Sequence, residues 1–88
     1  MQKFKIKYLS FPDDVHGVTM EKQGYYLIVI NDNSTPEMQH MTLKHELSHI
    51  FLDHFNDPRP IEEIESEAEC FASEMTDEEF DHLMAWKI

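Results

Sequence analysis

The chain of 88 residues has little positive charge, a single cysteine and only two glycines. Seven Lys and Arg stand against eighteen Asp and Glu, and the net charge of −11 excludes direct nucleic-acid binding because a phosphate backbone would be repelled. The lone Cys70 cannot form an internal disulfide, which excludes a secreted scaffold held together by disulfides. No apolar run reaches the roughly 20 residues that span a bilayer, and the N-terminus lacks the apolar segment of a signal peptide. We therefore expect a soluble, cytoplasmic protein with one domain over residues 1–88 and no membrane partner.

The first third of the sequence has the pattern of β-strands. Residues 3–9 alternate basic and apolar side chains, as in a strand with one solvent-exposed face, and residues 15–20 and 25–30 are two further candidates. Residues 11–14 have the composition of a turn, and Gly24 provides the positive φ of a hairpin loop between the last two strands. These signals predict a small antiparallel sheet of about three strands.

The remaining sequence has the pattern of helices. Thr35 is a good N-cap for a first helix over residues 36–55, which a proline-rich turn ends. A second helix follows over residues 61–75, and a capping box that begins at Thr76 opens a third helix toward Trp86. Strands followed by helices predict an α+β fold in which the sheet packs on the first helix and the second helix lies antiparallel beside it.

An HExxH motif, His45-Glu46-Leu47-Ser48-His49, lies in the middle of the first predicted helix. Residues four apart lie on one helix face, so the two imidazoles can bind one zinc ion at about 2.0–2.1 Å. Glu46 points to the side of the metal and can act as general base on a water molecule. The motif thus predicts a site for one Zn²⁺ with ligands His45 and His49 and catalytic Glu46. The other four histidines are expected to be surface or packing residues: His16, His40, His54 and His82.

A zinc site with two histidines needs a third protein ligand, which the acidic second half of the chain can supply. The turn between the first two helices is short, so these helices should lie antiparallel. The first helix rises about 9 Å from His49 to Phe55, and six residues of the next helix return about as far, to Glu67. Glu67 also lies on the rim of the second helix's apolar stripe, whereas Glu65 flanks that stripe on its other side. We therefore predict Glu67 as the third ligand, with Glu65 as the alternative.

Two segments together resemble a known family. HELSH at residues 45–49 and ESEAECFA at residues 65–72 resemble the ImmA/IrrE family of gluzincin metallopeptidases, whose usual pattern is HELGH followed by ExEANxFA. The resemblance covers about residues 25–75. Ser48 replaces the usual Gly, one small residue for another, and Glu69 stands where the family usually has Asn.

The resemblance implies a minimal zincin-like domain with zinc ligands His45, His49 and Glu67 and a catalytic carboxylate at Glu46. Members of this family typically cleave a repressor partner, often in the regulation of phages or mobile elements. The resemblance therefore also implies a transcriptional repressor as the protein substrate.

Two functions from different classes follow. The leading hypothesis is a zinc metalloendopeptidase that hydrolyses a peptide bond in a protein substrate. The alternative is a catalytically inactive zinc-binding module whose acidic surface binds a basic regulator. A fourth coordination position open to water would favour the peptidase. The sequence does not select the donor that would stabilise the oxyanion among five chemically able residues: Tyr25, Tyr26, His16, His54 and His82.

Two further expectations concern the surface. An extended substrate can add to the edge of a sheet, and residues 25–30 are the plausible edge strand. Six large apolar residues are expected in the core rather than on a partner-binding face, because so small a chain needs its apolar residues inside: Met38, Met41, Phe51, Phe55, Met84 and Trp86.

Overall fold

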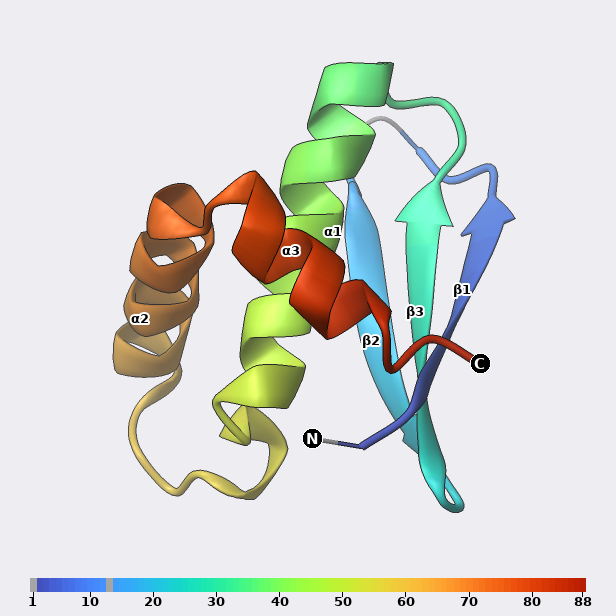
Figure 1. Ribbon diagram of the computed structural model, residues 1–88. Coiled ribbons are helices and arrows are strands. Elements are labelled where there is room, and N and C mark those ends of the chain that lie inside the picture. Colours follow the sequence, from blue (N-terminus) through green and yellow to red (C-terminus); the bar gives the residue numbers. More distant parts are fainter. Residues whose placement is uncertain (1, 13) are drawn as a thin grey trace.

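Three strands precede three helices along the chain, with a short 3-10 turn after the first helix: β1 (Phe4–Leu9), β2 (Gly17–Lys22), β3 (Tyr25–Asn31), α1 (Pro36–Phe51), η1 (His54–Asn56), α2 (Ile61–Glu74) and α3 (Asp77–Met84). The computed structural model describes residues 2–12 and 14–88, so Asp13 of the predicted turn at 11–14 lies outside the described residues. Helix α1 stands between the sheet and α2, and α3 crosses in front of it (Figure 1).

The sheet is mixed rather than antiparallel. Strand β3 lies in the middle, with β1 parallel to it on one side and β2 antiparallel to it on the other. Gly24, with a φ of 82°, forms the predicted turn between β2 and β3. The predicted α+β class is confirmed. The all-antiparallel sheet is wrong because the connection after β1 passes to the far edge of β3, and side-chain alternation does not specify the direction of a neighbouring strand.

A buried asparagine holds this connection in place. Asn31, at the end of β3, is fully buried, and its Nδ2 donates to the carbonyl oxygens of Phe11, Pro12 and Val15. The Asn31 Oδ1 accepts from the backbone N–H groups of Phe11 and Asn33 at 3.2 and 2.9 Å. One side chain thus satisfies backbone groups of the β1–β2 connection that would otherwise be left unpaired.

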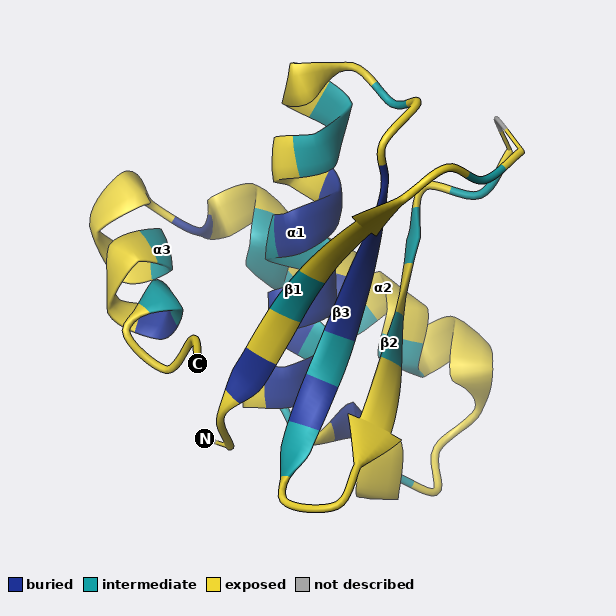
Figure 2. Ribbon diagram, turned by 90° about the vertical axis from the view of Figure 1, so that its right-hand side faces the viewer, coloured by how far each residue is buried: buried dark blue, intermediate teal, exposed yellow. Residues whose placement is uncertain are grey.

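Helix α1 presents its apolar face to the sheet. Leu43, Leu47 and Ile50 are buried in the core, where burial of each such side chain contributes about 1.5–3 kcal/mol. They meet buried side chains of two strands, Phe4, Tyr26, Ile28 and Ile30, and the buried residues gather between α1 and the sheet (Figure 2). Ser48 is fully buried and its hydroxyl donates to the Lys44 carbonyl at 2.8 Å, so a small residue is accommodated where the family usually has Gly.

The two edges of the sheet differ. The end of the chain runs beside β1, where the Ile88 N–H donates to the Phe4 carbonyl at 2.7 Å and the Phe4 N–H donates to the Trp86 carbonyl at 3.3 Å. Among the described residues, no strand pairs with the outer edge of β2. The predicted edge strand at 25–30 is therefore wrong: those residues form the central strand, and β2 has the open edge.

The first helix ends four residues earlier than predicted, at Phe51 rather than Phe55. Asp53 adopts the left-handed conformation, with φ of 57° and ψ of 42°, which Asp tolerates better than most residues. Its Oδ1 accepts from Asn56 Nδ2 at 2.9 Å, and the 3-10 turn follows at once. This change of direction returns His54 to the lower end of α1, whereas in a continuous helix His54 would lie about 140° around the axis from His49.

Four of the six apolar residues expected in the core are exposed. Met41 is 61% exposed, Phe51 49%, Phe55 37% and Trp86 45%. Met41 lies on α1 and Phe51 ends it, whereas Phe55 lies in η1 and Trp86 follows α3, so none of the four points into the core between α1 and the sheet. Met38 and Met84 are half-buried. No helix in the described part of the chain is long and apolar enough to cross a membrane.

The left-handed Asp53 generates a stability prediction. Asp53→Ala should lower the free energy of unfolding by about 1–2 kcal/mol. The Cβ of Ala is sterically strained in the left-handed conformation, and the variant loses the hydrogen bond to Asn56. The free energy of unfolding of Asp53→Gly should stay closer to that of the wild type, because Gly adopts the left-handed conformation without steric strain. Urea unfolding followed by circular dichroism measures both variants. Equal stability of the Ala and Gly variants would contradict the left-handed conformation.

Candidate metal centre

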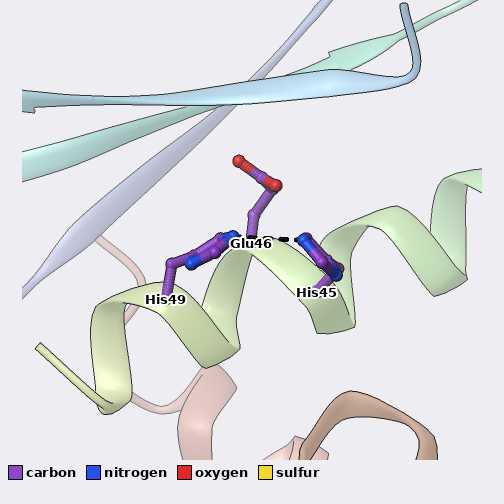
Figure 3. A group of neighbouring side chains, drawn as sticks. All are labelled: His45, Glu46 and His49. Atoms are coloured by element: carbon purple, nitrogen blue, oxygen red, sulfur yellow. Dashed lines mark hydrogen bonds between the residues drawn. The ribbon is translucent and has the colours of Figure 1, made fainter. Parts of the chain in front are cut away.

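Two imidazoles from successive turns in the second half of helix α1 come together on one face of it. The Nε2 atoms of His45 and His49 lie 3.1 Å apart, and the rings stand nearly perpendicular, with 80° between their planes. Figure 3 shows the two rings side by side on one face of the helix, with Glu46 pointing from the helix toward the strands. Ligand atoms of all three residues lie within 4.8 Å of one another, which makes this a possible metal-binding group.

Helix α2 brings the carboxylate of Glu65 to the same two nitrogens. Glu65 Oε2 lies 3.1 Å from His45 Nε2 and 2.8 Å from His49 Nε2. Ligands that surround zinc tetrahedrally at 2.0–2.1 Å lie about 3.3 Å from one another, so these three atoms have close to the spacing that the ion requires. Two imidazoles and one carboxylate are also the donor set of many catalytic zinc sites, which leave a fourth position open.

Glu67, the predicted third ligand, does not lie beside the imidazole pair. Its Oε1 accepts from His54 Nε2 at 2.6 Å and from Arg59 Nη2 at 2.9 Å. These hydrogen bonds, the one from Arg59 above all, lower the pKa of the Glu67 carboxyl to about 2. The carboxylate that lies beside the imidazoles is thus that of the alternative, Glu65, and the assignment of the third ligand stays a prediction.

The physical reason lies in the early end of helix α1. From His49 to its last residue, Phe51, the helix rises about 3 Å rather than about 9 Å. Because α1 extends a shorter distance beyond His49, fewer residues of α2 are needed to come back beside the imidazoles. The α2 residue that lies next to them is therefore nearer the start of α2. Glu65 is four residues into α2, whereas Glu67 is six residues in.

Glu46 occupies a different environment from its two neighbours. It is only 9% exposed, and its Oε1 accepts from the Thr19 hydroxyl of β2 at 2.8 Å. Burial raises the pKa of the Glu46 carboxyl, an effect that the Thr19 hydrogen bond and the nearby His45 partly oppose. A carboxylate with a raised pKa and one oxygen held by a hydroxyl is suited to accept a proton from water.

Sequence reasoning missed two residues that contact this group. Thr19 could not be assigned because its contact depends on which strand lies at the edge beside α1. His54 was expected to be a surface or packing residue, yet its side chain is 3% exposed and its Nδ1 lies 2.9 Å from His49 Nδ1. The available signal for His54 was the cluster of Asp53, Asn56 and Asp57, residues that favour the end of a helix.

A groove of about 680 Å³ opens beside the metal-binding group. His45, Glu46 and Glu65 line it together with apolar side chains of α1, Met38 and Met41. Glu69, which replaces the family's usual Asn, also lines the groove and is exposed. The groove lies between the start of β2 and helix α2, so an extended segment can reach the imidazoles there.

The five candidate oxyanion donors lie in different places. His16 lines the groove, and its Nδ1 lies 3.3 Å from Ser34 Oγ. The Tyr26 hydroxyl donates to Glu21, and the Tyr25 ring lies under Lys5 Nζ. The remaining two are His54, which contacts Glu67, and His82, which is exposed on α3. Of the five, only His16 is among the residues that line the groove.

Comparison with protein families relates this geometry to known proteins. The peptidase family described as the IrrE N-terminal-like domain matches residues 1–85. The comparisons with curated proteins and with solved structures found no match. The match extends over both segments on which the resemblance to ImmA/IrrE metallopeptidases was based, and over all three strands and helices. The chain belongs to the IrrE N-terminal-like domain family of peptidases.

Proposed function

We propose that the protein is a zinc-dependent endopeptidase that hydrolyses a peptide bond in a protein substrate. The observation that carries this proposal is the convergence of His45 Nε2, His49 Nε2 and Glu65 Oε2 within 3.1 Å of one another. These three side chains would hold the ion. When bound, zinc polarises the scissile carbonyl and lowers the pKa of water.

Glu46 supplies the proton transfers. Its Oε1 accepts from Thr19 at 2.8 Å, which leaves Oε2 to take a proton from the attacking water and pass it to the leaving amine. Its location beside the imidazole pair suits this role, because both Glu46 and His45 line the groove in which we propose the peptide to bind. His16 is the protein side chain that we propose to stabilise the oxyanion.

The substrate enters as an extended segment along the open edge of β2. Among residues 2–12 and 14–88 no strand pairs with that edge, and it lies beside Glu46, which accepts from Thr19 of β2. Met38 and Met41 provide an apolar wall, so the segment should carry an apolar side chain next to the scissile bond. The net charge of −11 favours a basic protein partner, such as the DNA-binding part of a transcriptional repressor.

The inactive binding module accounts less well for the position of Glu46. A purely structural zinc site does not require a buried carboxylate beside its ligands. Such a site commonly has four protein ligands that include Cys. Cys70 is exposed and its Sγ donates to Glu74 at 3.8 Å, away from the imidazoles. Cys70 therefore supports no fourth protein ligand at the two Nε2 atoms.

Glu46→Gln tests the general base. The variant should bind one zinc ion like the wild type, while hydrolysis of an unstructured peptide library falls by about 100- to 10,000-fold because the amide cannot accept the proton. Mass spectrometry of the library measures cleavage, and elemental analysis measures zinc. Undiminished cleavage by this variant would remove Glu46 from the mechanism.

Glu65→Gln tests the third ligand. Its zinc affinity should fall by more than about 100-fold, since changes to residues outside the ligand set already cost roughly 10- to 100-fold. Competition with a chelator measures the affinity. Glu63→Gln, an exposed change on the same helix, is the matched control. A larger loss in Glu67→Gln than in Glu65→Gln would restore Glu67 as the ligand.

Met41→Glu tests the apolar wall of the groove. It should lower kcat/KM for library peptides by roughly 10-fold, because the carboxylate would lie where an apolar side chain is expected, while zinc affinity stays unchanged. Ile61→Glu, at a position that is 71% exposed and outside the groove, is the control. Equal peptide preferences of the Met41 variant and the wild type would place the substrate elsewhere.

A further inference from the structure

A chain of hydrogen bonds leads from His49 away from the zinc-binding side. His49 Nδ1 lies 2.9 Å from His54 Nδ1, and His54 Nε2 lies 2.6 Å from Glu67 Oε1. Glu67 in turn accepts from Arg59 Nη2 at 2.9 Å, and Arg59 also binds Asp57. The His54 side chain is 3% exposed, so both of its ring nitrogens depend on these partners rather than on water.

The chemistry of the partners sets the direction of each hydrogen bond. A carboxylate held by Arg59 can only accept, so His54 donates through Nε2. A neutral His54 then has an unprotonated Nδ1, which accepts from the Nδ1–H of His49. Glu65 Oε2, 2.8 Å from His49 Nε2, competes for a proton on that nitrogen in the metal-free protein, whereas the hydrogen bond to His54 favours the tautomer with the lone pair on Nε2. This is the tautomer that binding of a metal through Nε2 requires.

The backbone places His54 specifically for this contact. A continuous helix would carry it about 140° away from His49, and the left-handed Asp53 redirects the chain into η1 instead. The next residue, Phe55, packs its ring near those of His49 and Tyr26, with centroids 6.5 and 5.0 Å apart. The turn therefore fixes the imidazole of His49 from two sides.

We infer that His54 and Glu67 are positioning residues that hold His49 in its zinc-binding tautomer and orientation, through the sequence of contacts Glu67–His54–His49. The inference rests on the proposed function in that it assumes zinc at Nε2. Glu67, which the sequence predicted as a zinc ligand, would then act on His49 indirectly, through the imidazole of His54. His54 does not line the groove, so it acts on His49 and not on the substrate.

His54→Phe provides the main test, because it keeps a ring in the turn and removes both hydrogen bonds. Zinc affinity, measured by chelator competition, should fall by about 10- to 100-fold. His54→Gln should recover most of that loss, since its amide oxygen can accept from His49 and its amide nitrogen can donate to Glu67. His82→Phe, which changes an exposed histidine on α3, is the matched control and should bind zinc like the wild type.

A second readout does not depend on zinc. Long-range ¹H–¹⁵N correlation spectra of the metal-free protein carrying Glu65→Ala, which removes the carboxylate that competes for a proton on His49 Nε2, should show His49 protonated at Nδ1 with His54 or with His54→Gln, and a mixture of tautomers with His54→Phe. Unchanged zinc affinity and an unchanged His49 tautomer in His54→Phe would overturn the inference. If that variant does not fold, Glu67→Leu, which removes the acceptor for His54 Nε2, decides, since unchanged zinc affinity and an unchanged tautomer there would overturn it equally. A wild type that binds no zinc, together with the Nδ1–H tautomer in the Glu65→Ala protein, would instead refute the proposed function alone.

Discussion

Burial of one face of helix α1 against the sheet determines the geometry of the site. With Leu47 pointing into the core, rotation by about 100° per residue places His45 and His49 on the opposite side of the helix, toward α2. Glu46 falls on the rim of the buried face, beside strand β2. The apolar core therefore separates the two groups of side chains, with the imidazoles and Glu65 between the two helices and Glu46 between helix and sheet.

The surroundings of Glu46 differ from those of Glu65 and the two imidazoles in their exposure to solvent. Glu65 and the imidazoles are partly open to solvent, so a water molecule and a peptide can reach them. Glu46 lies in a drier position, where burial raises the pKa of its carboxyl. Burial also lowers the pKa of His49, which favours the neutral imidazole that a metal needs.

Local signals in the sequence were sufficient for most of the elements. The N-cap at Thr35 and the capping box from Thr76 to Glu79 are formed as predicted, because each depends on residues three positions apart. The parallel pairing of β1 and the choice between Glu65 and Glu67 depend on distant segments. The presence of Glu65 rather than Glu67 beside the imidazoles traces to one residue, Asp53, because a left-handed end of α1 changes the level at which α2 passes the imidazoles.

The segment at Trp86–Ile88 has a further consequence, because it pairs with β1 and leaves β2 as the open edge among the described strands. An unpaired strand edge accepts any extended chain, including a second copy of the same protein. Self-association and substrate binding would then use the same backbone groups. On the proposed function, a second copy at high concentration would therefore compete with the substrate for this strand edge.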